Sequence, residues 1–170
     1  MKKLIIEKLS RIIKNKKKLE AKLNIKITNR GKEIFIDGKP ENEFVAEKVI
    51  DALNFGFPFS TALLIKEEDC EFEIINIKNY TNRKNKEQVR GRIIGKQGKV
   101  LKVLSDLTNC YFELKDNEIG IVGEPECIKN AQDAVIGIIR GAKHGNIYKR
   151  LEKNQVKEIG DLGLRIKRLR

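Results

Sequence analysis

The sequence is poor in the residues that build metal centres and disulfide frameworks. It has no tryptophan, three prolines, one histidine and three cysteines. Cys70, Cys110 and Cys127 form no CxxC pair, whereas a structural zinc site needs four closely spaced Cys or His ligands. An odd number of cysteines also argues against a disulfide framework. The lone His144 and the scattered cysteines leave no nucleophile–histidine pair, so we predict no metal, no cofactor, no catalytic residue and no enzyme.

Long hydrophobic runs are missing as well. No apolar stretch approaches the ~18 residues that a membrane helix needs. The N-terminal apolar run ends at Glu7 and is shorter than the apolar core of a signal peptide, which takes about 7–15 residues. We therefore expect a soluble, cytoplasmic protein with no membrane partner. Hydrophobic residues still make up 40% of the chain, which is enough for a folded core.

Positive charge dominates, and it is unevenly distributed. The formal net charge is +12. Basic charge is concentrated in three segments, as in proteins that bind a polyanion. A solvated, lysine-rich surface is the alternative, and a membrane-surface helix is disfavoured because the basic segments lack an aromatic apolar face. The balance is +10 for residues 1–32, −8 for 33–77, +8 for 78–103, −4 for 104–142 and +6 for 143–170.

The chain contains an internal repeat at a spacing of 85 residues. Gly38-Lys39-Pro40-Glu41 matches Gly123-Glu124-Pro125-Glu126. Upstream the spacing shortens to 81, where Ile12-Ile13 aligns with Ile93-Ile94, so the first copy lacks four residues. Two copies of one small module explain this pattern. Other identical pairs at the longer spacing are Asn24 and Asn109, Ile34 and Ile119, Ile36 and Ile121, Ala46 and Ala131, and Gly56 and Gly141.

The second copy predicts the element order β-α-α-β-β-α. Alternating apolar residues indicate its strands, and apolar residues at i, i+3, i+4 and i+7 indicate its helices. Pro125 and Glu126 mark a helix start, because proline suits the first turn and an acid suits the positive end of the helix dipole. The predicted strands are 72–78, 110–114 and 119–122, and the predicted helices are 88–94, 99–107, one from residue 125 and a short one at 147–151.

The first copy follows the same plan, with a strand at 2–6, a helical stretch at 8–23, a hairpin around Gly31 and a closing helix at 40–53. A short linking helix is expected at 57–64. We predict an α+β fold of two modules, each with a three-stranded antiparallel sheet and helices packed on one face. The predicted divisions are a first module at 1–56, a linker at 57–71, a second module with an extra C-terminal helix at 72–154, and a basic tail at 155–170.

The stretch Arg90–Val100 carries the most informative motif. Gly95 and Gly98 bracket two polar residues between two predicted helices. Glycine lets a ligand backbone come close, and the free amides of the helix that Gly98 opens favour an anion. A phosphodiester backbone is the natural occupant of such a loop when cations surround it. The surrounding cations are Arg90, Arg92, Lys96, Lys99 and Lys102.

Other phosphate-binding motifs do not fit this stretch. A P-loop has four residues between its first glycine and its GK pair and then Ser or Thr, but Gly91 and Gly95 enclose three residues and Gln97 follows Lys96. A dinucleotide-binding fingerprint reads G-x-G-x-x-G, which is not the spacing found here. A GxxG by itself most often connects two helices. Its position within β-α-GxxG-α-β-β-α makes it specific.

In this setting, Arg92–Lys99 resembles the signature of a type I KH domain, and the resemblance spans residues 72–141. It implies a groove for about four single-stranded nucleotides with the GxxG loop as the backbone clamp. Ile94 and Val100 would help form an apolar floor for the bases, with ordinary core packing as the alternative, and the strand Cys110–Leu114 would edge the groove. The RNA-binding residues expected on this basis are Arg90, Arg92, Ile94, Gly95, Lys96, Gln97, Gly98, Lys99, Val100 and Lys102.

Most of residues 1–154 resemble the archaeal partner-of-Nob (Dim-type, Krr-like) tandem KH proteins. Beyond the two copies, the resemblance rests on Asn54-Phe55-Gly56-Phe57 and on Gly141–Glu152. It implies two type I KH modules and a role in small-subunit ribosome assembly, with binding to precursor ribosomal RNA near its 3′ end. The partners implied are the endonuclease that cuts there and the alpha subunit of an initiation factor.

The first copy departs from the KH pattern, because Lys14–Lys17 replaces the glycine loop or the loop is deleted. Residues 9–23 could form one continuous helix, and we predict a structural or protein-binding role for this module. The leading function is single-stranded RNA binding by the second module, and the alternative is a protein-interaction scaffold. A nuclease would need clustered carboxylates, and Glu67-Glu68-Asp69 is expected to be an exposed link instead. His144 is expected to shape the short helix after it, and Arg165–Arg170 to be a solvated end.

Overall fold

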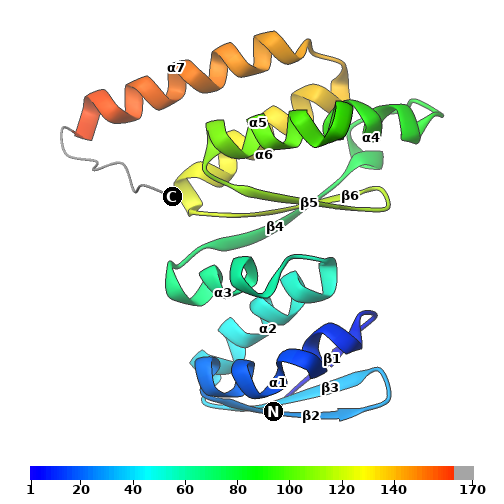
Figure 1. Ribbon diagram of the computed structural model, residues 1–170, viewed down its shortest axis with the longest axis vertical. Coiled ribbons are helices and arrows are strands. Elements are labelled where there is room, and N and C mark those ends of the chain that lie inside the picture. Colours follow the sequence, from blue (N-terminus) through cyan, green and yellow to red (C-terminus); the bar gives the residue numbers. More distant parts are fainter. Residues whose placement is uncertain (163–170) are drawn as a thin grey trace.

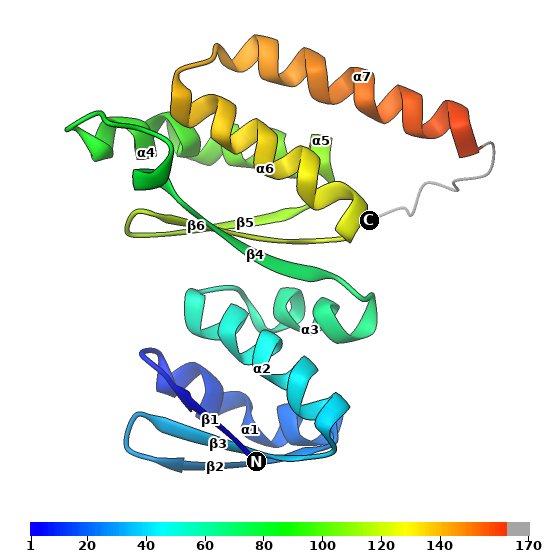
Figure 2. The same ribbon diagram turned by 180° about the vertical axis from the view of Figure 1, so that it is seen from behind.

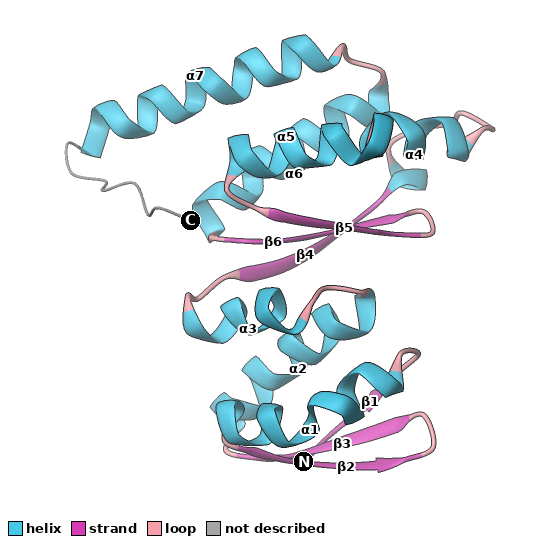
Figure 3. Ribbon diagram, viewed as in Figure 1, coloured by secondary structure: helices cyan, strands magenta, loops and turns pink. Residues whose placement is uncertain are grey.

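A computed structural model describes residues 1–162, with side chains as far as Gln155. Two three-stranded antiparallel sheets, each accompanied by helices, are stacked along the long axis of the molecule (Figure 1; Figure 3). The strand order is β1-β3-β2 in the first sheet and β4-β6-β5 in the second. The first module comprises β1 (Lys2–Ile5), α1 (Leu9–Leu23), β2 (Ile25–Arg30), β3 (Glu33–Gly38) and α2 (Pro40–Phe55).

A linking helix, α3 (Phe59–Glu67), leads into the second module. None of the helices among the described residues is long and apolar enough to span a membrane. Two 3-10 turns, Ile77–Asn79 and Lys96–Gly98, flank the first helix of this module. Its other elements are β4 (Glu71–Asn76), α4 (Lys86–Ile94), α5 (Lys99–Thr108), β5 (Tyr111–Lys115), β6 (Glu118–Gly123), α6 (Pro125–Arg140) and α7 (His144–Leu162).

The sequence repeat corresponds to repeated structural positions, which confirms the predicted fold class of two KH-like modules. Asn24 and Asn109 follow α1 and α5 with φ of 52° and 54°, a left-handed conformation that asparagine tolerates. Ile12 and Ile93 are both fully buried. The glycine–x–proline stretches both end a strand and start a helix, at α2 and α6.

The first module has one uninterrupted helix where the second has two helices and a loop. Its element order is therefore β-α-β-β-α, shorter by one helix than the order expected for both copies. Lys14–Lys17 lie within this helix, and lysine is a good helix former. The unbroken helix and the four-residue shortfall in the sequence favour deletion of the loop over its replacement.

The end of the chain differs from the expectation. The predicted short helix at 147–151 is the buried part of α7, which runs on to Leu162 and so into the segment expected to be a tail. Ile147 and Leu151 pack on the second core and are 4% and 2% exposed. Val156, Ile159 and Leu162 recur at three-residue spacing after them, a helical period that the prediction did not use. The expectation for Arg165–Arg170 lies outside the described residues.

Both faces of the second sheet are covered. Helices α4, α5 and α6 lie on one face, and α2 and α3 approach the other (Figure 1; Figure 2). Phe72 of β4 meets the rings of Phe55 and Phe57 edge-on at 5.8 Å between centroids. A Cβ atom at Gly120 would lie 2.8 Å from both Phe55 and Phe57, so this close approach depends on a glycine in β6. The predicted helical layer on one face is present, and the first module supplies a second layer.

Candidate nucleic-acid interface

The GxxG loop joins α4 to α5 through three residues with positive φ. Gly95 ends α4 with φ 73° and ψ 176°, Gln97 has φ 55°, and Gly98 has φ 75°. The amide of Gly95 donates to the carbonyl of Gly91 at 2.8 Å, and the amide of Gly98 donates to the carbonyl of Gly95 at 3.3 Å. The loop is therefore a tight turn with a defined conformation.

The two glycines are needed for different reasons. A Cβ atom on Gly95 would lie 2.3 Å from Cγ2 of Val100, so this position must stay bare for the loop to close on α5. A Cβ atom on Gly98 would meet no atom within 4 Å. Gly98 is thus constrained by its left-handed backbone alone, and the space above it is open for another backbone to approach.

The loop is accessible to solvent. Lys96 and Gln97 at its tip are exposed, and Gly95 and Gly98 are half-buried. The amide of Lys99 donates to the carbonyl of Lys96, and no side chain among the described residues caps the N-terminus of α5, so the other first-turn amides of this helix keep free donors. Such an end attracts anions because of its free amides and the helix dipole.

Three of the predicted cations extend from the loop along α5. Lys96, Lys99 and Lys102 are exposed, and none of them forms an ion pair within the described part of the chain. Lys99 and Lys102 are three residues apart and therefore share a face of α5. These side chains are available to neutralise an external anion.

Arg92 lies elsewhere. Its guanidinium donates to the carbonyl oxygens of Ile138 at 2.9 Å and Ala142 at 2.6 Å, both at the end of α6. Nε2 of His144 is 2.9 Å from the carbonyl oxygen of Arg92. Arg92 therefore has a structural role at the α4–α6–α7 junction, and His144 lies at the start of α7; the phosphate contact of Arg92 stays a prediction.

Arg90 is half-buried, and its Nε is enclosed without a hydrogen-bond partner among the described residues. Only the outer part of its guanidinium can reach a ligand. Val100 packs against the second hydrophobic core while keeping part of its surface, and Ile94 is also half-buried, next to the fully buried Ile93. Val100 therefore rests on the core, and both side chains leave part of their apolar surface exposed beside the loop.

The strand expected to edge the groove lies at an edge of its sheet. Among the described residues, β5 pairs with β6 alone, so its outer backbone groups have no strand partner there. Cys110 lies just before β5 and is fully buried against Gly123, so the edge begins at Tyr111. Burial raises the pKa of the Cys110 thiol to about 12 and that of Cys70 to about 11, with a smaller contribution from nearby Cys127 in each case. Both thiols are therefore protonated at neutral pH.

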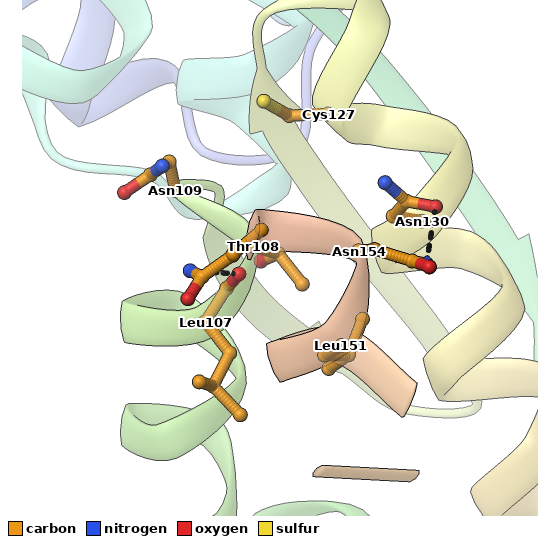
Figure 4. A pocket seen from close by; sticks show the side chains of 8 residues that line it. Leu107, Thr108, Asn109, Cys127, Asn130, Leu151 and Asn154 are labelled. Atoms are coloured by element: carbon orange, nitrogen blue, oxygen red, sulfur yellow. Dashed lines mark hydrogen bonds between the residues drawn. The ribbon is translucent and has the colours of Figure 1, made fainter. Parts of the chain in front are cut away.

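Helix α7 holds the far end of α5, a contribution that the sequence analysis missed. Nδ2 of Asn154 donates to Asn130 of α6 at 3.3 Å, and Nε2 of Gln155 donates to the carbonyl of Leu107 at 2.5 Å (Figure 4). The pocket between these helices encloses about 10 Å³. That is room for one water molecule at most, so we assign the pocket a packing role.

The carboxylates raised as a nuclease candidate do not form a site. Glu67, Glu68 and Asp69 are exposed at the end of α3, and Glu67 pairs with Lys22 at 2.9 Å. Among the described residues, no group of three His, Cys, Asp or Glu side chains is placed to hold a metal ion.

Comparison with known proteins gives a consistent result. Residues 71–156 match the family model described as eukaryotic type KH-domain (KH-domain type I). A KH domain-containing protein of Methanocaldococcus jannaschii is 31% identical over 154 residues, covering 84% of this chain and 66% of that protein. The pre-rRNA-processing protein pno1 of Emericella nidulans is 30% identical over 111 residues, covering 63% of this chain and 43% of pno1. The chain thus spans about half to two thirds of these relatives.

Two solved structures from Pyrococcus horikoshii share the whole arrangement. Dim2p superposes with a TM-score of 0.82 and 25% identity, covering 89% of this chain and 98% of that one. The a/eIF2alpha-aDim2p-rRNA complex superposes with a TM-score of 0.83 and 25% identity, covering 92% and 94% of the two chains. The GxxG turn, the tandem modules and these matches together show that the chain belongs to the Dim/Pno1-type family of type I KH-domain proteins.

Proposed function

We propose that this protein binds single-stranded RNA through its second KH module. The observation that carries this proposal is the open GxxG turn: a Gly98 with free space above it, beside exposed and unpaired Lys96, Lys99 and Lys102. A phosphate backbone can approach the bare main chain there while the lysines neutralise it. The half-exposed Ile94 and Val100 and the free edge of β5 then face the bases.

We propose precursor small-subunit ribosomal RNA near its 3′ end as the target, during ribosome assembly. The support is the similarity to pno1, which is named a pre-rRNA-processing protein, and to a Dim2p crystallised with rRNA. The same complex contains a/eIF2alpha, so the alpha subunit of that initiation factor is a candidate partner. The endonuclease of the rRNA 3′ end is proposed as a second partner on the resemblance described above. The proposed role is binding without catalysis, in the cytoplasm.

Charge reversal at the loop tip tests the proposal. In the double variant Lys96→Asp/Gln97→Asp, carboxylates replace groups that would face phosphate, so we expect RNA affinity to fall at least tenfold in a fluorescence anisotropy titration. Lys32→Asp/Asn29→Asp is the matched control, because it changes the charge equally at exposed positions of the first module. Equal affinities for the two variants would refute the clamp.

The salt dependence of the same titration gives a second readout. For single strands, log K falls with log salt at about −0.7 per neutralised phosphate, so three lysines predict a slope of about −2. The loop variant should have a shallower slope than the control.

A protein-interaction scaffold is the second candidate, favoured by the first module, where α1 runs without a glycine loop. Partner capture that survives nuclease treatment, together with no RNA affinity in the pure protein, would support the scaffold over the RNA-binding function.

A further inference from the structure

The start of α7 contacts the end of the helix that presents the GxxG loop. Nε2 of His144 lies 2.9 Å from the carbonyl oxygen of Arg92, in the last turn of α4 and shortly before Gly95. A carbonyl oxygen only accepts hydrogen bonds, so Nε2 carries the proton and donates it. In both Figure 1 and Figure 2, the turn between α6 and α7 lies at the same end of the second module as α4.

The carbonyl of Arg92 needs a donor from outside its helix. The last four carbonyls of an α-helix have no partner within the helix. α4 ends at Ile94, and the amide of Gly95 donates to the carbonyl of Gly91. Among the described residues, no backbone amide donates to the carbonyl of Arg92. His144 therefore supplies the hydrogen bond that the helix loses where the loop begins.

His144 belongs to a closely packed part of α7. Ile147 and Leu151, one and two turns further on, are buried against the second core. A Cβ atom at Gly137 of α6 would lie 2.7 Å from Cδ1 of Ile147, so α7 comes as near to α6 as a glycine allows. The ring of His144 also lies 6.2 Å from that of Tyr148. The donor is thus fixed in position by its own helix.

The sequence repeat supplies an internal comparison for the Arg92 side chain. At the spacing of 81 residues, Arg11-Ile12-Ile13 aligns with Arg92-Ile93-Ile94. Nη1 of Arg11 donates to the carbonyl of Gly56 at 2.5 Å, just after α2, as Arg92 donates to carbonyls at the end of α6. Both modules have this arginine contact, although the first has no GxxG loop. The arginine contact therefore belongs to the fold that the modules share.

The histidine contact differs between the two modules. At the spacing of 85 residues, the counterpart of His144 is Phe59, the first residue of α3, whose side chain has no hydrogen-bond donor. The carbonyl of Arg11 lies inside the continuous α1 and also accepts from Nδ2 of Asn15 at 2.8 Å, so it needs no donor from α3. The histidine contact thus accompanies the loop, whereas the arginine contact does not.

From this difference we infer that His144 is a positioning residue for RNA binding, which holds the last turn of α4 and so fixes the GxxG loop. The positive-φ residues of the loop, Gly95, Gln97 and Gly98, follow directly from that turn. A loop that is ordered before its ligand arrives binds more tightly, because less conformational freedom is lost on binding. The inference rests on the proposed function, and it makes the grip on RNA depend on α7.

Two substitutions at one position test the donor. His144→Leu removes the donor and keeps a side chain of similar bulk, whereas His144→Gln keeps an Nε2–H donor but carries no charge. The probe is an RNA of about five nucleotides, just beyond the roughly four that a KH groove holds. In fluorescence anisotropy, we expect His144→Leu to bind it at least about threefold more weakly, because one hydrogen bond is worth about that factor. His144→Gln should bind like the unaltered protein.

Asn146→Leu is the matched control and should bind the RNA like the unaltered protein. Asn146 is exposed in the same turn of α7, and its side chain forms no hydrogen bond within the described part of the chain. Equal losses of affinity for His144→Leu and Asn146→Leu, or for His144→Leu and His144→Gln, would overturn the inference. The second result, with a shallower salt dependence in both variants, would make His144 a cation that contacts phosphate.

Amide hydrogen exchange, followed by NMR, gives a readout that needs no RNA. In His144→Leu, the amides of Gly95 and Gly98 should exchange faster, while the amide of Leu104, a buried residue of α5, keeps its rate. A general loss of stability would speed exchange at all three positions and would overturn the inference. Unchanged exchange in the loop would overturn it as well.

The binding measurements separate this inference from the proposed function. If the unaltered protein bound no RNA, the proposed function would fail, and the role of His144 in RNA binding would fail with it. If the unaltered protein bound RNA and His144→Leu bound it equally well, the inference about His144 alone would fail.

Discussion

At the scale of single residues, the two glycines of the GxxG loop differ in what can occupy the space that a Cβ atom would take. Gly95 makes room for Val100 within the protein, whereas the space above Gly98 is empty. Of the two loop glycines, Gly98 is therefore the one whose substitution tests for the approach of an external ligand. Sequence spacing identified both positions but did not distinguish their roles, because the distinction depends on where Val100 points.

Gly98→Ala should lower RNA affinity by more than its effect on stability explains. Its left-handed φ of 75° costs an alanine about 1–2 kcal/mol, and the new methyl group would stand where the RNA backbone approaches. Gly31→Ala is the control, because Gly31 also has positive φ, 60°, and open space but lies in the hairpin of the first module. Urea unfolding should show a similar loss in the free energy of unfolding for both variants. Fluorescence anisotropy should show weaker RNA binding for Gly98→Ala alone. Similar RNA affinities for the two variants would show that no backbone comes close to Gly98.

Arg92 shows what residue patterns leave open. Its place in the basic cluster predicts a phosphate contact, which stays a prediction, while Nη1 and Nη2 each donate to one carbonyl, in the last turn of α6 and just after it. That end is about 50 residues away in sequence and becomes a neighbour only when α4 and α6 pack together. Cys110 was likewise placed on the strand edge by alternation and is instead buried before it.

At the scale of elements, periodicity predicted most helices and strands to within a few residues. The prediction ended α7 near Leu151, although Val156, Ile159 and Leu162 continue a helical period beyond it. For the first GxxG loop the sequence left two alternatives, replacement by Lys14–Lys17 or deletion, and the unbroken α1 favours deletion. The sequence did not predict that α7 contacts the end of α5. That contact depends on polar interactions such as the hydrogen bond from Gln155 to the carbonyl of Leu107.

Leu151→Ala should destabilise the protein by about 2–4 kcal/mol, because it leaves a cavity where a 2%-exposed side chain packs on the second core. The free energy of unfolding in urea measures this loss. Lys149→Ala on the exposed side of the same helix should change it by less than about 0.5 kcal/mol. A small effect of Leu151→Ala would mean that α7 contributes little to the second core.

At the scale of the whole molecule, polar contacts link the modules in addition to the aromatic packing around Gly120. Glu7, before α1, pairs with Lys115 of β5 at 2.5 Å. The hydrogen bond and charge of Lys115 lower the pKa of Glu7 below its ordinary value. A lowered pKa in the folded state gives stability that is present at neutral pH and is lost as the pH falls through that pKa.

Glu7→Gln should therefore lower the urea midpoint at pH 7 and lower it less at pH 3, because protonation of the native Glu7 on acidification removes the charge that Lys115 attracts. Because the Glu7–Lys115 pair is exposed, the difference in urea midpoint between the variant and the unaltered protein will be small, and it should shrink further in high salt. Glu152→Gln on α7 is the control, and its midpoint should follow that of the unaltered protein at both pH values. A difference in urea midpoint that is as large at pH 3 as at pH 7 would show that the Glu7 charge is not its source.

The ring-to-glycine packing at Gly120 also bears on how such a duplicated protein can evolve. Phe72, Tyr111 and Val122 of the second copy belong to the core that the first copy builds. If the gene were split between the two copies, the second module would lose the layer that covers this face of its sheet. The aromatic side chains there would be exposed, and such a hydrophobic surface promotes aggregation. The first copy, which has no glycine loop, is thereby kept as a structural partner, since its twin now folds against it.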